Sequence, residues 1–598
     1  MCKAEGKPQE QKSAGFENSV AFCTWREICW RALLCLLILP ILALFVVGLP
    51  ISLLYYYMVY VPRRRQVVKG LGAESDNRSL RFRLPFKCPW SIRGGQIARD
   101  VPLPVVGACS NGEALETLQH DLEAPECTPQ PRLERRILEN YSCTYLVVAD
   151  VCDVRSEQDI VAAVRWAHRT GSRVRAMGSL FSWPEMVADG RESVVLSLKG
   201  YCRVLGCTPL EGPGECGAVA FVEVEAGTKI WQLNAALDEL GYVLPTLGNV
   251  TGQSVGGVIS TATHGKRMFG SDGSTIGTLS SLVERVRLVT ADGTVEVVQV
   301  AGGGDRGRAV AVSVGMLGVL STVTLRVERK HELEFSISTC GFEEGLRRLP
   351  GLLEQSEAVS LVYWPTLDSW RLEVATRPAP AAGEGPRPLP MPEQSRLKLF
   401  FCGALNVLLS YYYWVPGLLH LAHRIAIADG QSDRPYRGPS DRVVALNVEM
   451  DLEHHELEFA FDFERRAEVL HAYRDALRRL PPSIAAWCII DVRVTGSDEA
   501  WLSPAHGRPT LWVDVVVPMR IKKHFNKLCK EVVPVAEAFG GRPHWGKINP
   551  CSAEYTRASF PCFAEFAATR REMDPQGVFG NVWLDKFFED VTECSVVV

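Results

Sequence analysis

Between about residues 140 and 330, apolar and polar positions follow two different periods. From Asp153 to Arg173 the apolar side chains recur every three or four residues, which predicts an amphipathic helix. The residues on its apolar face are Ile160, Val161, Val164 and Ala167. Short apolar or alternating runs at 173–177, 221–225 and 321–327 predict strands instead. This part of the chain therefore contains both helices and strands.

Two further alternating segments lie nearer the C-terminus, at 457–463 and 511–517. A period of two places successive side chains on opposite faces, so both segments are predicted to be strands of one antiparallel sheet. Ahead of them, the proline- and glycine-rich stretch 378–396 lacks core-forming residues and is predicted to be a flexible insertion.

Two long apolar runs carry no charged residue. Residues 32–62 exceed the 20 or so residues that cross a hydrocarbon core, which predicts a transmembrane segment, either a single pass or a hairpin. Tyrosines near its end and the arginines at 63–65 place the body of the protein on the cytosolic side by the positive-inside rule. The second run, 399–421, favours buried or membrane-grazing helices over a second span.

Composition removes several classes of function. The 598 residues are 47% hydrophobic and 22% charged, with a net charge of −4, so the chain is globular. No long basic stripe exists, so nucleic acid is not an expected partner. The 19 cysteines include no C-x-x-C pair, so we expect reduced thiols and no metal site.

Glycine-rich turns interrupt the predicted elements at two places, after residue 177 and between 248 and 265. Glycine lacks a Cβ and allows backbone N–H groups to approach an anion closely. The sequence of the second turn is GNVTGQSVGGVISTATHG, and a third turn, SVGMLGVL, begins at Ser313. Turns of this kind predict a ligand with a pyrophosphate group.

Together these features resemble the FAD-binding domain of the vanillyl-alcohol-oxidase/p-cresol-methylhydroxylase (PCMH) superfamily. The resemblance spans about residues 140–329 and implies an α+β fold with two subdomains built from small mixed sheets, with FAD as cofactor. The residues implied to bind FAD are Arg175, Ala176, Met177, Gly178, Ser179, Leu180, Phe181 and Ser182 in the first loop, Gly248, Asn249, Gly252, Ser254, Gly257, Ser260, Thr261, His264 and Gly265 in the second, and Gly318 and Val319 in the third.

Two motifs near the C-terminus narrow the resemblance. GGRPHWGK at 540–547 and DPQGVFGNVWL at 574–584 are similar to the aldonolactone oxidases, the L-gulonolactone oxidases in particular. This likeness implies an antiparallel-sheet cap (substrate) domain over the flavin and a site made of Asp491, Arg493, His544 and Lys547. Asp491 and Arg493 share one face of a strand, because they lie two positions apart.

The resemblance also assigns roles to these four residues. Arg493 is expected near the flavin and the substrate oxygen, and His544 is the first candidate for proton transfer. Lys547 would bind substrate oxygens or the flavin, while Glu458 is a further candidate on the cap sheet. Asp491 is expected to hold the substrate hydroxyls or to orient Arg493. Relatives usually carry glutamate at this position, so the shorter side chain implies either a remodelled pocket or a water molecule that fills the gap.

Residues in the first two glycine-rich loops bear on how the flavin is attached and on whether it reacts with O2. Phe181 stands where many relatives have the histidine that bonds covalently to the cofactor, so the FAD is predicted to be non-covalent. His264 is expected to support the loop rather than to carry the flavin. Gly248 matches a position where alanine is associated with dehydrogenases, so a glycine there favours an oxidase that uses O2.

We therefore expect a membrane-anchored flavoprotein that oxidises L-gulono-, L-galactono- or D-arabinono-1,4-lactone at C2 and releases H2O2, as in ascorbate-type biosynthesis. Two alternatives are an NADPH-dependent sterol-type reductase and an inactive flavin-binding scaffold. Membrane lipid is an expected partner, and the endoplasmic reticulum is implied by resemblance alone. Asn77 and Asn140 lie in N-x-S sequons that could report membrane sidedness.

The expected domain limits follow from these patterns. They are an N-terminal tail at 1–31, the transmembrane segment at 32–62, a linker at 63–139, the FAD-binding domain at 140–329, the cap domain at 330–560 and a C-terminal return to the FAD-binding domain at 561–598.

Overall fold

The computed structural model describes residues 131–588 apart from 143, 189–192, 211–218, 271–272, 379–387, 391–415, 433, 446–453 and 519–521. Within these residues, none of the helices combines the length and the apolar character that a bilayer span requires. The transmembrane prediction for 32–62 and the arginines that follow it lie outside the described residues, as do Asn77, most of the 378–396 insertion and residues 399–415. These expectations stay predictions.

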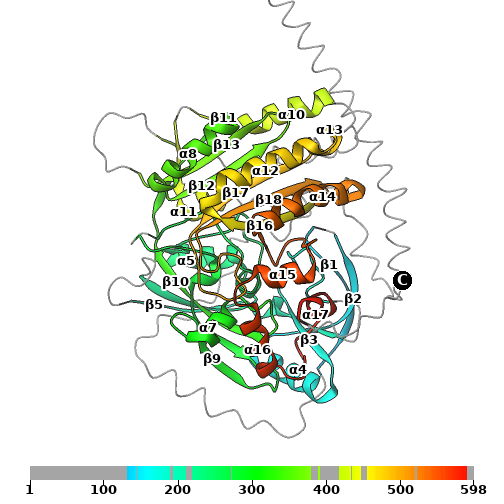
Figure 1. The fold of residues 1–598 in the computed structure, drawn as a ribbon. Helices are drawn as coiled ribbons and strands as arrows, with labels where there is room; N and C mark the ends of the chain where they lie inside the picture. Colours follow the sequence, from blue (N-terminus) through cyan, green and yellow to red (C-terminus); the bar gives the residue numbers. More distant parts are fainter. Residues whose placement is uncertain are drawn as a thin grey trace, which may run out of the picture.

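The described chain forms two domains, seen one above the other in Figure 1. The lower one, which we call the two-sheet domain, begins with a mixed four-stranded sheet in the order β1-β2-β4-β3. Its elements are β1 (Glu134–Glu139), β2 (Leu146–Asp153), α4 (Glu157–Thr170), β3 (Arg173–Met177), β4 (Ser193–Ser197) and the 3-10 turn η3 (Leu198–Gly200). The predicted helix at 153–173 is confirmed as α4, which begins after a Ser156–Asp159 capping box and ends at Gly171 in the left-handed region.

The second sheet of this domain has the order β5-β6-β10-β8-β9, and β7 also pairs with β10. Its elements are β5 (Val204–Pro209), β6 (Ala220–Glu225), α5 (Ile230–Leu240), β7 (Tyr242–Val243), α6 (Val255–Ser260), η5 (Leu279–Leu282), β8 (Val283–Val289), β9 (Val295–Gln299), α7 (Gly304–Ala311) and β10 (Val319–Arg329). Every pair in it is antiparallel, so the expectation of two mixed sheets is wrong for this one. The reason is that β5–β6 and β8–β9 are neighbours in sequence and pair directly.

The upper, cap domain is one nine-stranded sheet in the order β14-β15-β11-β13-β12-β17-β18-β16-β19. Its strands are β11 (Glu332–Gly341), β12 (Ala358–Trp364), β13 (Ser369–Thr376), β14 (Leu389–Pro390), β15 (Tyr436–Pro439), β16 (His454–Asp462), β17 (Ile489–Thr495), β18 (Thr510–Pro518) and β19 (Arg542–Pro543). All pairs are antiparallel except β14–β15, and β16 and β18 confirm the strands predicted at 457–463 and 511–517.

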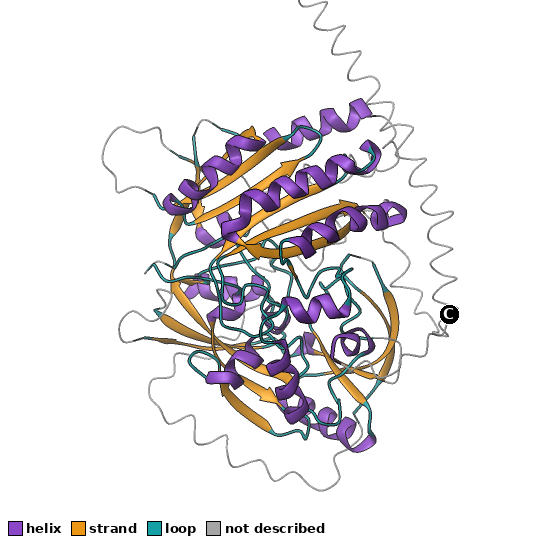
Figure 2. Ribbon diagram, viewed as in Figure 1, coloured by secondary structure: helices purple, strands orange, loops and turns teal. Residues whose placement is uncertain are grey.

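Helices cover one face of the cap sheet, where α8, α12 and α14 lie side by side (Figures 1 and 2). The helical elements of this domain are α8 (Phe342–Gln355), α10 (Pro416–Ala428), α11 (Ser440–Val444), η6 (Phe463–Arg465), α12 (Arg466–Arg479), α13 (Pro482–Ala485) and α14 (Lys522–Ala538). Odd-numbered β16 residues such as Leu457 and Phe459 enter the core beneath these helices. The other face of the sheet therefore turns toward the two-sheet domain.

After β19 the chain returns to the two-sheet domain through α15 (Ala553–Ser559), α16 (Phe563–Met573) and α17 (Val582–Phe588). Phe566 and Phe579 are buried in the same core as α4 and β10. A backbone bond from Val174 N–H to Val578 C=O, 2.8 Å, joins this return to strand β3. The last elements thus pack directly behind the first glycine-rich loop.

Candidate active site

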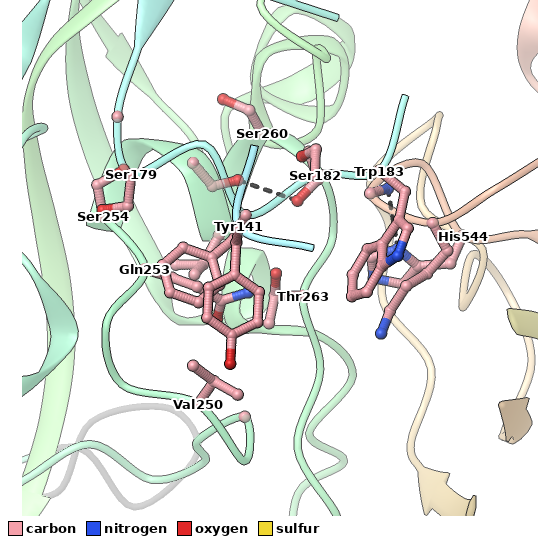
Figure 3. Close-up of a pocket in the computed structure, with 18 of the residues that line it drawn as sticks. Tyr141, Ser179, Ser182, Trp183, Val250, Gln253, Ser254, Ser260, Thr263 and His544 are labelled. Atoms are coloured by element: carbon pink, nitrogen blue, oxygen red, sulfur yellow. Dashed lines mark hydrogen bonds between the residues drawn. The ribbon is translucent and has the colours of Figure 1, made fainter. Parts of the chain in front are cut away.

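A cavity of about 380 Å³ lies between the loops of the two-sheet domain and the bare face of the cap sheet. Figure 3 shows Ser179 and Ser254 together at one end and Trp183 and His544 at the other. The lower wall comes from the three glycine-rich loops, and the upper wall comes from β12, β13, β16, β17, β18 and the HWGK segment. The sequence motifs that predicted a cofactor and those that predicted a substrate site therefore share one enclosed space.

The first two loops touch each other. A Cβ added at Gly178 would lie 1.9 Å from Ser254 Oγ, at the residue that precedes α6. A Cβ added at Gly256 would lie 3.0 Å from the Cβ of Ala226. Because side chains are absent at these points, backbone groups line this end of the cavity, which fits the pyrophosphate of a dinucleotide.

Arg175 ties the third loop to the first. Its buried guanidinium donates to the carbonyl groups of Met186 (2.9 Å), Val314 (2.7 Å), Gly315 (2.7 Å) and Phe579 (2.8 Å). One cation therefore connects loop one, loop three and the C-terminal DPQGVFG segment. Its fixed positive charge lines the cavity and suits an anionic ligand.

Most of the described non-glycine residues with a positive φ angle lie in the same loops. Four described non-glycine residues have a positive φ angle, and three of them belong to the three loops: Leu180 (55°), Ala262 (56°) and Val314 (45°). Side chains with a Cβ adopt this region at an energetic cost, and such residues concentrate at ligand sites. The loop shapes are therefore set by their surroundings rather than by local preference.

Phe181 occupies the position at which relatives carry a flavin-linked histidine. Its ring stacks on Tyr141, with centroids 4.2 Å apart and planes 18° apart, and both rings line the cavity. Asn140, beside this stack, is buried and its side-chain amide donates to Ser142, Thr144 and the Ser182 carbonyl. The Nδ2 atom of Asn140 is therefore enclosed and engaged, and this sequon is not accessible to glycosylation in the folded protein.

The upper wall is polar because three cap strands turn charged residues toward the cavity. On β16, His454, Glu456 and Glu458 alternate with apolar Leu457 and Phe459, which face the helices. The register pairs Glu458 with Asp514 of β18, and Asp514 with Asp491 of β17. A buried wall so rich in carboxylates and cations is adapted to ligands with many hydroxyl groups, because charged groups buried without partners are costly.

His264 joins the second loop to the cap. Its Nδ1 donates to the carbonyl of Gly265 (3.0 Å), and its Nε2 donates to Glu458 Oε1 (2.9 Å). Burial opposes ionisation of Glu458, but the adjacent His264 lowers the pKa of that carboxyl to about 2. The imidazole also stacks on Trp512 at 3.7 Å. These contacts fix the imidazole in place, and through it the second loop is joined to the cap domain.

Lys547 lies among two carboxyl groups and an aromatic ring. Its Nζ contacts Glu456, lies 3.3 Å from Asp514 Oδ2 and sits 4.5 Å above the Trp183 ring. Burial lowers the pKa of Lys547 to about 7. Burial and the charge of Glu458 raise the pKa of Asp514 well above its ordinary value. At neutral pH, amine and ammonium forms of Lys547 are both populated.

His544 is held in one tautomer. Its Nδ1 accepts the Gly546 backbone N–H at 3.0 Å, which leaves the proton on Nε2. Burial lowers the pKa of His544 to about 4, so the ring is neutral at physiological pH. In this state the Nε2–H of His544 can donate a hydrogen bond, whereas Nδ1 is already engaged as an acceptor.

Asp491 holds Arg493 from outside the cavity. Its Oδ2 accepts from Arg493 Nε at 3.1 Å and from a second guanidinium nitrogen, while its Oδ1 accepts from Ser360 Oγ at 3.0 Å. Burial opposes the charge of Arg493, but Asp491 and Glu458 together raise its pKa above the ordinary value. Arg493 lines the cavity and Asp491 does not.

Most of the predicted site residues line this one cavity. Those that do are Arg175, Ala176, Gly178, Ser179, Leu180, Phe181, Ser182, Gly248, Asn249, Ser254, Gly257, Ser260, Thr261, His264, Gly318, Arg493, His544 and Lys547. Those outside its wall are Met177, Gly252, Gly265, Val319 and Asp491. Met177 and Val319 are buried in cores, and a Cβ at Gly265 would lie 2.2 Å from Thr246 Oγ1, so that glycine serves packing.

Several lining residues were not predicted from the sequence. They are Tyr141, Gln253, Thr263, Glu373, His454, Glu456 and Asp514, together with neighbouring loop residues. For β16 a signal existed, because His454, Glu456 and Glu458 form a polar stripe between apolar residues. Asp514 lies singly in an apolar strand, and Glu373 lies in a strand where polar and apolar residues alternate. Only strand register shows that these two residues face the cavity.

Comparison with known proteins identifies both parts of this arrangement. The family described as FAD binding domain matches residues 149–299, and the family described as D-arabinono-1,4-lactone oxidase matches residues 323–587. The chain therefore contains a FAD binding domain followed by a D-arabinono-1,4-lactone oxidase domain. It is a FAD-dependent oxidoreductase, and the bare loop walls fit that cofactor.

Similar proteins of known name cover most of the described chain. An L-gulono-1,4-lactone dehydrogenase from Mycobacterium tuberculosis is 28% identical over 430 residues, which is 71% of this chain and 92% of the relative. The L-gulonolactone oxidase of Mus musculus is 28% identical over 61% of this chain and 81% of its own. An alditol oxidase from Streptomyces is also 28% identical, over 71% and 92%.

A solved structure supports the fold. Cholesterol oxidase from B. sterolicum superposes with a TM-score of 0.61 at 18% identity, covering 76% of this chain and 97% of the other. At this identity the likeness concerns the fold alone. It supports the α+β fold, with a two-sheet domain beneath a sheet-based cap.

Proposed function

We propose that this protein oxidises the C2 hydroxyl of an aldono-1,4-lactone, with L-gulono-, L-galactono- and D-arabinono-1,4-lactone as candidate substrates. The observation that carries the proposal is the charged, hydrogen-bonding cap face set opposite the bare loops within one cavity. A sterol or other lipid would need apolar walls there, since buried charges without polar partners are costly. Bound FAD supplies the hydride acceptor for this chemistry.

Arg493 is the residue suited to stabilise developing negative charge. Its guanidinium is permanently cationic, it faces the cavity, and Asp491 and Ser360 fix its position from behind. A preoriented charge of this kind lowers the energy of a transition state without reorganisation during the reaction. Asp491 is thus a positioning residue, and its shorter side chain suits that role because it need not reach the substrate.

Lys547 is the residue suited to accept the hydroxyl proton. An amine with a pKa near 7 is partly deprotonated at the working pH, which is the condition for an efficient general base. His544, with Nδ1 engaged and its proton on Nε2, is better suited to donate a hydrogen bond to a substrate oxygen. The proton would pass to Lys547 Nζ and remain there beside the Glu456 carboxylate.

Electron transfer to O2, with H2O2 as product, is supported by Gly248. This glycine lines the cavity, and a Cβ there would come 3.3 Å from Thr263 Cγ2. An alanine would therefore narrow the cavity at this point. Because similar relatives are named both oxidase and dehydrogenase, the electron acceptor depends on such local features.

We further propose that FAD is held without a covalent bond, because Phe181 offers no nucleophile. Precipitation of the purified protein in acid should release yellow flavin into the supernatant. Colour that stays with the pellet would contradict this. Anchoring by residues 32–62 and a place in ascorbate-type synthesis remain parts of the proposal that depend on sequence pattern and resemblance.

The decisive experiment is anaerobic mixing of the detergent-solubilised full chain with a panel of substrates while the flavin absorbance is followed. The panel contains the three lactones, alditols, cholesterol in detergent and NADPH. We expect bleaching by at least one lactone. Bleaching by NADPH or cholesterol alone would favour a lipid-active enzyme, and a spectrum unchanged by every compound would favour an inactive scaffold.

A further inference from the structure

Glu373 is a carboxylate on the cavity wall that no sequence motif singles out. It lies on β13, two strands away from β17, and is only 7% exposed. Its Oε1 accepts from Arg371 Nε at 2.9 Å, and its Oε2 lies 3.7 Å from Lys266 Nζ. Two basic side chains therefore lie beside its two oxygens at the wall of the site.

Strand register places Glu373 opposite Arg493 across a small residue. Ser360 of β12 pairs with Arg493 on one side and with Glu373 on the other, so all three share one face of the sheet. Neighbouring strands are about 4.8 Å apart, which separates the Glu373 and Arg493 backbones by roughly 10 Å. Because Ser360 is small, the two long side chains flank an open part of the wall.

Asp491, in contrast, lies outside the cavity wall. One of its oxygens accepts from Ser360 and the other from Arg493. The cavity is therefore lined by the guanidinium of the Asp491–Arg493 pair and not by its carboxylate. A site that binds hydroxyl groups needs acceptors around that guanidinium, because a guanidinium only donates. Glu458 also lines the cavity, but its Oε1 is already hydrogen-bonded to His264.

We propose that Glu373 is a specificity-determining residue, which supplies the carboxylate that accepts hydrogen bonds from substrate hydroxyls in place of Asp491. This rests on the proposed function, namely that the cavity binds a polyhydroxylated lactone. An ionised carboxylate offers about four acceptor positions, and Arg371 and Lys266 use only part of them. The remaining positions bind a substrate hydroxyl beyond the carbon that is oxidised.

The surroundings of Glu373 support a rigid, prearranged acceptor. A second nitrogen of Arg371 donates to the carbonyls of Ile427 and Asp429 at the C-terminal end of α10, which fixes the guanidinium beside Glu373. Lys266 follows the second loop and is 3% exposed, so its ammonium is enclosed with the Glu373 carboxylate. A carboxylate fixed in this way loses little conformational entropy when a hydroxyl binds.

The test measures binding separately from chemistry. Wild-type protein and Glu373→Gln are titrated with the lactone that reduces the flavin, and with analogues that each lack one hydroxyl. Dissociation constants come from the concentration dependence of anaerobic flavin reduction and from perturbation of the flavin spectrum. We expect Glu373→Gln to weaken binding of the complete lactone roughly 10- to 100-fold, the range for a hydrogen bond to a charged group. The limiting reduction rate should change less than about threefold.

One analogue should bind wild type and Glu373→Gln equally, and its missing hydroxyl is the one that Glu373 contacts. Glu373→Asp, which keeps the charge beside Arg371 and Lys266 but withdraws it from the cavity, should lose affinity while keeping wild-type thermal stability. Glu344→Gln, an exposed carboxylate on α8, is the matched control and should resemble wild type.

Two results would overturn the proposal. One is unchanged binding and unchanged discrimination among all analogues in both Glu373 variants. The other is a loss confined to the limiting rate. If no lactone perturbs or reduces the wild-type flavin, the proposed function itself fails, and that outcome is distinct because it precedes any comparison of variants.

Discussion

The contact between the first two loops makes Gly178→Ala an informative perturbation. The added Cβ would lie 1.9 Å from Ser254 Oγ and 2.9 Å from Ser254 Cβ, so the loops must separate. Overpacking of a tight contact typically costs about 1–3 kcal/mol. If the FAD-bound protein carries that cost, the dissociation constant of FAD rises roughly 5- to 150-fold.

Second-site variants test this explanation directly. Ser254→Ala removes the nearest atom but keeps its Cβ, and Ser254→Gly removes both atoms. The FAD affinity of Gly178→Ala should therefore improve stepwise in the two double variants, by the logic of a double-mutant cycle. Ser254 makes no side-chain capping bond to α6, so the single Ser254 variants should lower the stability of the apoprotein little.

The assay is titration of apoprotein with FAD, followed by quenching of flavin fluorescence, beside thermal unfolding of the apoprotein. Gly351→Ala on α8 is the matched control, because a Cβ there meets nothing within 4 Å. The reasoning is refuted if Gly178→Ala binds FAD like wild type. It is equally refuted if Ser254→Gly fails to restore any affinity to the double variant.

Three further changes test the chemistry of the site. Because burial lowers the pKa of Lys547 to about 7, its amine form increases as the pH rises. The rate of anaerobic flavin reduction should therefore increase up to about pH 7 and then level off. In a stopped-flow pH series, Lys547→Met should reduce the flavin slowly and should lack this increase. Asp491→Asn leaves buried Arg493 without its nearest counter-charge, so the free energy of unfolding in urea should fall by about 3 kcal/mol. As a control, Asp305→Asn, which breaks the exposed ion pair with Arg308, should change the free energy of unfolding little. Gly248→Ala should slow oxygen consumption at least tenfold relative to wild type, while dye-linked turnover remains. Equal losses in the two assays would argue against a narrowed path for O2.

The sequence predicted local elements well where one period dominates. Helix α4 and strands β6, β10, β16 and β18 appear where the apolar pattern placed them. The second sheet of the two-sheet domain did not follow the expectation, because strand direction depends on which neighbours pair. That choice rests on contacts between distant segments, which a period cannot encode.

The same limit applies to the site. The glycine loops, Arg493 and Lys547 are visible in the sequence because they belong to motifs, and the structure brings them to one cavity. Glu373 and Asp514 are each the single acidic residue of their strand and look like ordinary solvent-facing positions. Only the register of β13 with β12, and of β18 with β16, turns them toward the cavity.

The bonds of Arg175 to Met186, Val314 and Phe579 have a consequence for biosynthesis. The carbonyl of Phe579 belongs to a segment that the ribosome adds 404 positions after Arg175. A nascent chain that stops short of it lacks one anchor of the dinucleotide platform, however completely its earlier sheets have folded. Cofactor loading should therefore wait until residue 579 has been added, and truncation before residue 579 should yield a colourless product.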